Sequence, residues 1–265
     1  MPTTYAHYRF GRDVLASLPE SCQETIEEYR DLYNIGLHGP DLLFYYKALV
    51  KNPVNRAGFA MHDRPGREFF ETAAPAVQNL KDQTAARAYL FGFLCHFALD
   101  SNCHPYVEKM VRESTSTHSA IEAELDRHLM EKDGLNPMYH KPAGHLKACA
   151  FHARVISLFF PDLDVVKIEK CIRSIRFYCG LLAPPGAALH RGFAGFMKLI
   201  GCSKSFCDMV IRPEKIQECV PMCGELERLY QKAVQDAAEL IENFDAYIDG
   251  AAKLDGRLEH TFGEF

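Results

Sequence analysis

YLFGFLCHFALDSNCHPY, residues 89–106, is among the most apolar stretches of the chain, and its few polar groups have helical spacing. His96, Asp100 and His104 follow one another at steps of four residues, which places them on one face of an α-helix. Imidazole nitrogens and carboxylate oxygens aimed at a common point suit a divalent transition metal such as zinc. In so apolar a helix these groups must be paired or metal-bound, because bare burial of polar groups is costly.

A second pair with the same spacing follows in HSAIEAELD, where His118 and Glu122 are four residues apart. A lone histidine in an apolar helix is more often a core residue that is hydrogen-bonded to the backbone, and the first row alone leaves that interpretation open. The second pair shifts the balance towards a metal site. His7 and the His-containing stretch at residues 38–41 shift it further.

Composition limits the class of protein. The 265 residues are 48% hydrophobic and 25% charged, which suits a globular protein of one large domain or two small ones. The net charge of −5 argues against duplex nucleic acid as a partner. It does not exclude a nuclease for single strands, whose metals would contact the phosphate.

The cysteines and the N-terminal sequence indicate in which cellular compartment the protein is expected. None of the ten cysteines forms a CxxC pair, so most are expected to be reduced and to act as small apolar residues. The start, MPTTYAHYRFGRDVL, lacks a basic segment followed by an apolar one. No apolar stretch reaches the ~20 residues that span a bilayer. We expect a cytoplasmic protein, or a secreted one if the chain begins at a processed N-terminus.

Helical periodicity dominates the rest of the chain, and period-2 alternation is scarce. The expected helices cover residues 20–36, 40–50, 66–80, a long run from 84, the segment that begins after the Ser/Thr cluster at 114–117, and then 145–160, 164–181, 187–200 and 213–248. This pattern predicts an all-α fold with a single domain over residues 1–265. The tail, residues 251–265, is expected to be frayed or packed as coil.

The candidate ligands, in chain order, resemble those of a known family, the zinc-dependent bacterial phospholipases C of the alpha-toxin type, which are related to single-strand-specific zinc nucleases. The ordered residues are His7, Asp41, His62, His96, Asp100, His104, His118 and Glu122. HFALDSNCHP and HSAIE are similar to the family's His-x3-Asp…His and His-x3-Glu segments. HGPDLLFYY and AMHDRPG resemble the segments that carry its early Asp and His ligands. The resemblance covers about residues 5–130.

The resemblance implies a multi-helix bundle with three zinc ions clustered in a cleft, and we expect two to three of them in this chain. One zinc would be held by Asp41, His62, His96 and Asp100; a second by Asp100 as a bridge and His7; and a third by His104, His118 and Glu122. Three departures are visible. The family places an N-terminal Trp on one zinc, whereas this chain has no Trp; the Asp100-to-His104 gap is shorter than the family's; and the secreted members carry signal peptides, whereas none is recognised in this sequence.

The roles of the remaining polar residues stay open. His38 is interpreted as a ligand, a group that orients Asp41, or a turn residue before Pro40. Asp126, four residues after Glu122, is interpreted as support for a ligand histidine or as a residue of a solvated helix face, and the solvated face is favoured. The other histidines are expected at the surface or in support of ligands: His128, His140, His145, His152, His190 and His260.

The implied activity is that of a zinc-dependent phosphodiesterase that cleaves a phospholipid on the glycerol side of its phosphate. Zinc would activate a water, with Asp41 as either a ligand or the catalytic base. The expected partner is a phospholipid or another phosphate ester, with transient contact to a membrane surface. The alternatives are a zinc nuclease or nucleotidase, and a non-catalytic protein whose helices zinc ties together.

Overall fold

Helices make up the regular secondary structure of the residues described in the computed structural model, which are 4–199, 201 and 203–263. In chain order the elements are α1 (Thr4–Leu15), α2 (Glu20–Glu28), α3 (Arg30–Gly36), the 3-10 helix η1 (Gly39–Tyr45), α4 (Pro53–His62), α5 (Gly66–Gln78), α6 (Thr84–Glu113), α7 (His118–Lys132), α8 (Ala150–Ser157), α9 (Val165–Leu182), α10 (Ala187–Leu199), α11 (Lys204–Asp208), α12 (Val220–Ile248) and the 3-10 helix η2 (Gly256–Glu259). The all-α prediction is confirmed.

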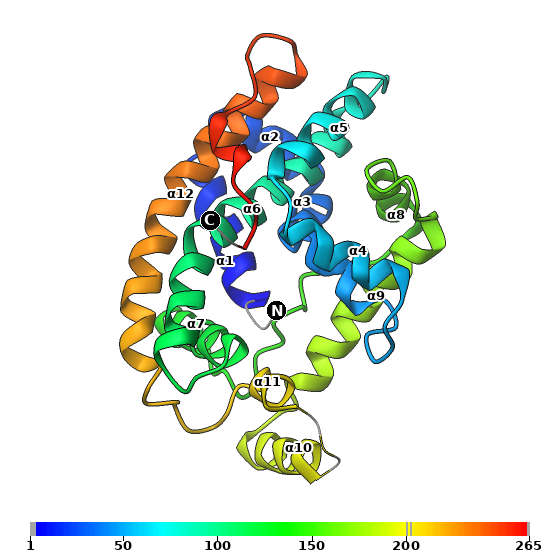
Figure 1. Cartoon of the computed structure of the whole chain (residues 1–265). Coiled ribbons are helices and arrows are strands. Elements are labelled where there is room, and N and C mark those ends of the chain that lie inside the picture. The colour runs from blue at the N-terminus through cyan, green and yellow to red at the C-terminus, as the bar shows by residue number, and fades with distance from the viewer. Residues whose placement is uncertain (1–3, 200, 202, 264–265) are drawn as a thin grey trace.

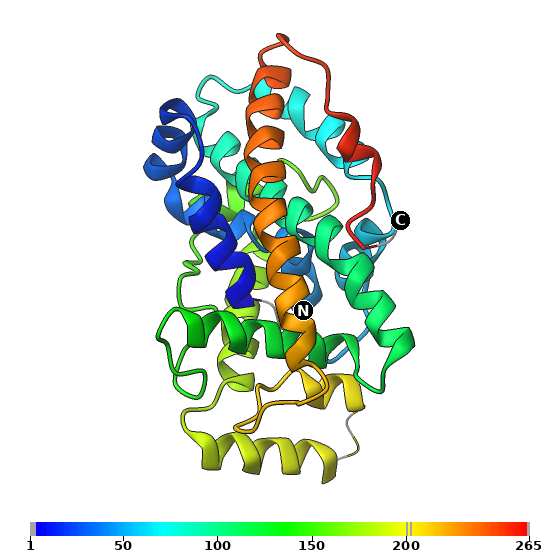
Figure 2. The same ribbon diagram turned by 90° about the vertical axis from the view of Figure 1, so that its left-hand side faces the viewer.

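The central helix is α6, which the other long helices surround (Figures 1 and 2). Nearly every residue from Ala85 to Asp100 is buried, as expected for a helix that is apolar on all sides. It packs mainly against α3 and α12. The crossing with α3 depends on Gly36 and Gly92, since a Cβ on Gly36 would lie 2.2 Å from the Tyr89 carbonyl oxygen. The two backbones can therefore approach closely only with glycine at these positions.

Several helix boundaries differ from those expected. The helix expected over 20–36 is broken by the non-helical backbone of Tyr29. The helix expected from Pro40 is a 3-10 helix that ends at Tyr45. Helix α12 was expected from residue 213 but begins at Val220. Pro221 then lies in its first turn, the only part of a helix in which proline costs no hydrogen bond. The start expected at 145 lies at Ala150, because the Cys149 side chain caps α8.

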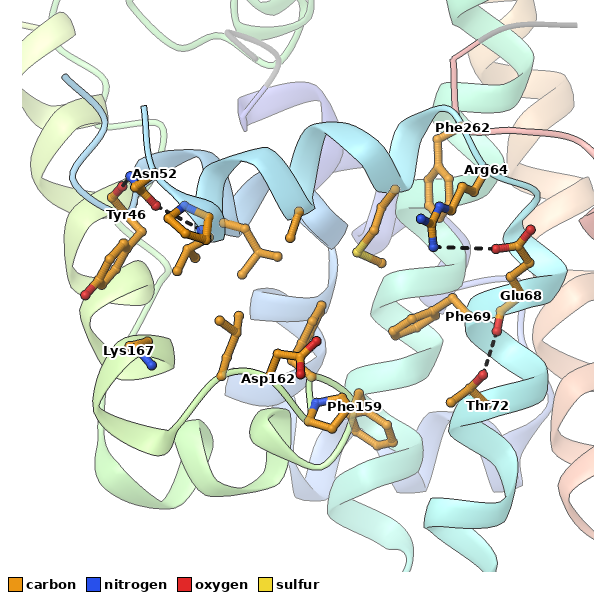
Figure 3. Close-up of a pocket in the computed structure, with 18 of the residues that line it drawn as sticks. Tyr46, Asn52, Arg64, Glu68, Phe69, Thr72, Phe159, Asp162, Lys167 and Phe262 are labelled. Atoms are coloured by element: carbon orange, nitrogen blue, oxygen red, sulfur yellow. Dashed lines mark hydrogen bonds and ion pairs between the residues drawn. The ribbon is translucent and has the colours of Figure 1, made fainter. Parts of the chain in front are cut away.

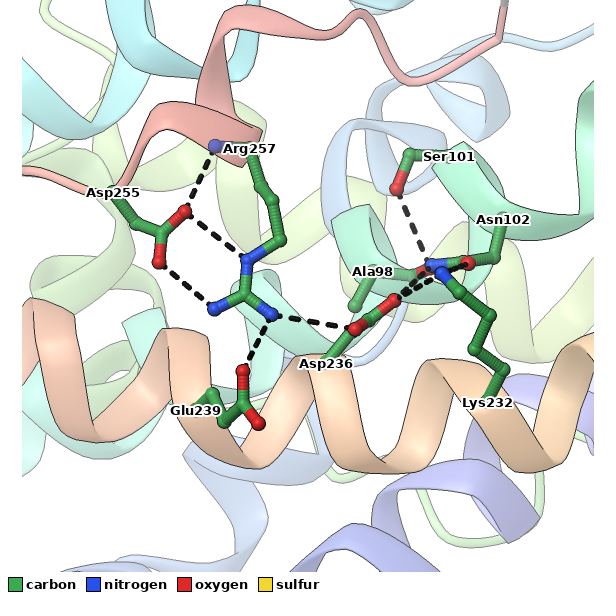
Figure 4. A network of polar contacts seen from close by, with 8 residues as sticks. All are labelled: Ala98, Ser101, Asn102, Lys232, Asp236, Glu239, Asp255 and Arg257. Atoms are coloured by element: carbon green, nitrogen blue, oxygen red, sulfur yellow. Dashed lines mark hydrogen bonds and ion pairs between the residues drawn. The ribbon is translucent and has the colours of Figure 1, made fainter.

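The C-terminal segment is packed coil with one helical turn, which confirms one of the two expectations for it. Arg257 hydrogen-bonds to Asp255 and to Asp236 and Glu239 of α12 (Figure 4). These contacts fix η2 on the bundle, and Phe262 beyond it is buried. Residues 264 and 265 lie outside the described residues. Among the described helices there is none with the length and apolarity to cross a membrane.

Candidate metal centre

The eight predicted ligands converge from five elements on one side of the bundle. They come from α1, η1, α4, α6 and α7, and they form three groups in which the ligand atoms lie within 4.8 Å of one another. The groups are His7, His96 and Asp100; Asp41, His62 and His96; and His104, His118 and Glu122. All but His96 line a cleft of about 240 Å³. The predicted cluster in a cleft is therefore present as a set of side chains.

Asp100 lies at the middle of the cluster. Its Oδ1 is 3.2 Å from His7 Nε2, and its Oδ2 is 3.1 Å from His96 Nε2. His62 Nε2 and His104 Nε2 each lie 3.8 Å from one of the two carboxylate oxygens. One carboxylate thus faces four imidazoles, two on each oxygen, which is the arrangement that the bridging interpretation requires.

The third group adds a residue that the sequence analysis had not selected. Glu122 Oε1 lies 3.2 Å from His118 Nε2 and 3.5 Å from His104 Nε2. On the far side of the His118 ring, Nδ1 is 2.7 Å from Glu108 Oε1. Glu108 also lines the cleft. It lies four residues after His104, so it continues the row of His96, Asp100 and His104 along the same face of α6.

Three imidazoles share a pattern in which Nδ1 bonds to an oxygen outside the ligand groups. His62 Nδ1 lies 3.0 Å from the Gly58 carbonyl, His104 Nδ1 lies 3.0 Å from the Phe262 carbonyl, and His118 Nδ1 bonds to Glu108. A donated Nδ1–H fixes the tautomer and leaves the lone pair on Nε2. In each case the Nε2 lone pair faces a carboxylate oxygen, and a cation bound between these two atoms would stabilise the arrangement.

His96 provides the strongest test of whether a metal fits. Its side chain is fully buried; Nδ1 has no hydrogen-bond partner among the described residues, and Nε2 lies 3.1 Å from Asp100 Oδ2 without the alignment of a hydrogen bond. The ring is held by Gly39, where a Cβ would lie 2.3 Å from His96 Cδ2. An unbonded buried imidazole is costly. A zinc ion would give Nε2 a partner beside the Asp100 carboxylate, so the residues fit the metal.

The shifted pKa values show that the carboxylates of the cluster favour positive charge on the neighbouring imidazoles. Burial lowers the pKa of His62, but the hydrogen bond and the charge of Asp41, together with the charge of Asp100, outweigh burial and raise that pKa to about 9. For His118, burial is likewise outweighed by Glu122, and the pKa rises to about 9. Burial acts to raise the pKa of Asp100, yet the imidazoles of His104 and His96 hold it well below its usual value. Without metal, protons would supply the missing positive charge.

His38 does not join the ligand groups. Its Nε2 lies 2.9 Å from His145 Nε2, and burial lowers its pKa well below the usual value. No bond between His38 and Asp41 occurs among the described residues, so the structure supports neither of the two metal-related interpretations. Of the histidines expected at the surface or in support of ligands, His190 is buried and bonds through Nδ1 to the Ile211 carbonyl.

Asp126 was expected on a solvated face, and this prediction is wrong. The side chain is buried, and its two oxygens accept hydrogen bonds from the backbone N–H groups of Tyr5 and Ala6. The first turn of a helix has unpaired N–H groups, and Asp126 supplies their acceptor from α7. It therefore fixes α1, and with it His7, against the helix that carries Glu122.

Three aromatic residues that lie beside the ligands were not anticipated. Phe44 and Phe59 stack with their ring centroids 4.0 Å apart and line the cleft beside His62. Phe262 packs against the rings of His62 and His96 from the C-terminal segment. Aromatic residues at these positions carry no sequence signal of their own, because only the fold brings them to the ligands.

Comparison with known proteins agrees with this geometry. The model of the family described as zinc-dependent phospholipase C matches residues 6–161, which is more than half of the chain. The chain belongs to the zinc-dependent phospholipase C family. The match includes all eight predicted ligands and ends before α9, so the extension of the domain to residue 265 stays a prediction. Searches of curated proteins and of solved structures gave no significant match.

Proposed function

We propose that this member of the family is a zinc-dependent phosphodiesterase that holds two to three zinc ions and cleaves phospholipids in the manner of a phospholipase C. The observation that carries the proposal is the row of three His/carboxylate groups with their Nε2 atoms turned towards carboxylates. Eight donors exceed what one metal needs. A single zinc ion that only held the helices together would leave most of these eight side chains without a bound cation.

The side chains at the cleft would have different roles in catalysis. Bound zinc supplies Lewis acidity and lowers the pKa of a bound water to about 7. Asp100 contacts His7 and His96 of its own group and faces His62 and His104 of the other two at 3.8 Å. Glu108 orients His118. Asp41 lines the cleft 3.1 Å from His62 Nε2, where it can hold metal or take a proton from the attacking water. The phosphate diester would lie in the cleft, with Phe44 and Phe59 beside its apolar part.

The open cleft favours an enzyme over a purely structural zinc protein. Structural zinc sites are closed by four protein ligands and often contain cysteine. Here the ligand groups contain only His, Asp and Glu and face a space large enough for several waters or a phosphate.

A nuclease remains the second candidate because of one observation. Phe59 is 57% exposed beside the cleft, and an exposed aromatic ring can stack on a base of a single strand.

Substrate screening tests the proposal. The protein reconstituted with zinc should hydrolyse a short-chain phosphatidylcholine, and chelation should abolish the activity until zinc returns. Other phospholipids and single-stranded DNA would be screened in parallel. Cleavage of DNA alone would favour the nuclease. Complete inactivity on all substrates, with the metal shown to be present, would contradict the proposal and favour a structural role for zinc.

A further inference from the structure

We propose that residues 46–52, here named the Leu49 loop, and the exposed side of α4 dock the protein on an anionic phospholipid bilayer. The loop reads YKALVKN and connects η1, which carries Asp41, to α4, which carries His62. Leu49 is 76% exposed and Val50 is 62% exposed. The surface thus lies between two elements of the metal centre, and it goes beyond the hydrolytic activity because it concerns how the protein reaches its substrate.

The loop is held by polar bonds that leave its aliphatic side chains outside. Asn52 Nδ2 donates to the carbonyls of Tyr46 at 2.9 Å and Val50 at 2.8 Å, and Asn55 Nδ2 donates to Val50 at 2.9 Å. Lys47 adopts a positive φ of 48°, and its carbonyl accepts from the Val50 N–H at 2.9 Å. A φ in this range costs free energy for a residue other than glycine. The loop is therefore fixed in a turn that presents Leu49 and Val50 to solvent.

The charge around the loop complements an anionic surface. Between Asp41 and Asp63 the sequence holds Lys47, Lys51 and Arg56 and no acidic residue, although acids outnumber bases in the whole chain. All three cations are exposed, and none forms an ion pair with a described carboxylate. Aliphatic tips flanked by basic residues suit the boundary between lipid headgroups and acyl chains.

A cavity beside the loop favours a lipid surface over a protein partner. It measures about 890 Å³, and its lining is mostly apolar. Figure 3 shows Tyr46, Asn52 and Lys167 at one end and Phe262 at the other. The face of α4 with Val54, Ala57 and Met61 lines it, whereas Phe59 and His62 of the same helix line the metal cleft. An apolar space of this size beside exposed aliphatic residues can receive an acyl chain.

Vesicle co-sedimentation of the full zinc-loaded chain tests the inference. Vesicles of phosphatidylcholine mixed with phosphatidylserine should bind the protein, and phosphatidylcholine alone should bind it less. Leu49→Asp with Val50→Asp should lower the partition coefficient at least about tenfold, since insertion of one leucine is worth that much. Lys47→Gln and Lys51→Gln should each lower it about fivefold. Both sets should keep the wild-type rate on a monomeric short-chain substrate.

A matched control uses aliphatic residues of α10, away from the loop. Leu199 is 84% exposed, and Leu189 is exposed on the same helix. The double variant Leu189→Asp with Leu199→Asp should bind vesicles as the wild type does. Absence of vesicle binding by the wild type, wild-type binding by the loop variants, or an equal loss in the α10 control would each overturn the inference. Vesicle binding that depends on the loop in a protein without phosphoesterase activity would overturn the proposed function and leave the docking surface standing.

Discussion

Replacement of Asp100 by Asn probes the bridge between two groups of the metal centre. Asp100→Asn keeps the shape of a buried side chain whose oxygens lie 3.1 Å and 3.2 Å from His96 and His7. It removes the charge that would offset two cations. At an effective dielectric constant of about 20, the attraction of unit charges about 4 Å apart is worth about 4 kcal/mol. Each 1.4 kcal/mol is tenfold, so zinc should bind about 10³-fold more weakly in at least one group.

The assay combines metal content with turnover. After reconstitution and desalting, Asp100→Asn should lack at least one zinc of the wild-type complement, and its rate on a phosphodiester should fall at least ~10²-fold. Glu124→Gln serves as the control, because Glu124 is a buried carboxylate of α7 that pairs with Arg127 and not with the ligand groups. The control should keep its zinc. Full metal content and full rate in Asp100→Asn would refute the bridging role.

Three further predictions concern groups around the ligands. Glu108→Ala should weaken zinc binding at the third group by about 10–100-fold, because it removes the acceptor that orients His118; an unchanged affinity in a chelator competition would exclude that role. Gly39→Ala should displace the His96 ring and reduce bound zinc in elemental analysis, whereas Gly256→Ala, where a Cβ would meet open space, should not. Burial lowers the pKa of His145 to about 3, below the unfolded value of about 6.5, so the stability that its neutral form supplies is present above pH 6.5 and lost as the pH falls. Between pH 7 and 5 the free energy of unfolding of the metal-free wild type, measured with denaturant, should fall by on the order of 2 kcal/mol more than that of the His145→Gln variant. An equal fall in both proteins would contradict this.

Positions in the fold could be predicted from the sequence where residues of one type recur at helical spacing. The apolar run around His96 predicted the buried α6, and the steps of four residues predicted that His96, Asp100 and His104 share a face. The same rule would have reached Glu108, had the row been extended by one more turn. Thr117 caps α7 by accepting from the Ala120 N–H, as the Ser/Thr cluster indicated.

The features that were missed depend on contacts between distant segments. Helix α1 was not expected from the sequence, and the N–H groups of its first turn are paired by Asp126, more than a hundred residues away. The orientation of His104 depends on the carbonyl of Phe262, which Arg257 brings to the site through its bonds to α12. No local pattern records which segments will meet, so neither the burial of Asp126 nor the role of the tail could be derived before the fold was known.

The central claim is that the three His/carboxylate groups form one multinuclear zinc centre. Its most direct test is a crystal of zinc-reconstituted protein, measured above and below the zinc absorption edge, together with elemental analysis of the same sample. We expect two to three equivalents of zinc per chain, with each anomalous peak at one of the three His/carboxylate groups. Less than one equivalent after reconstitution, or a peak away from these groups, would contradict it.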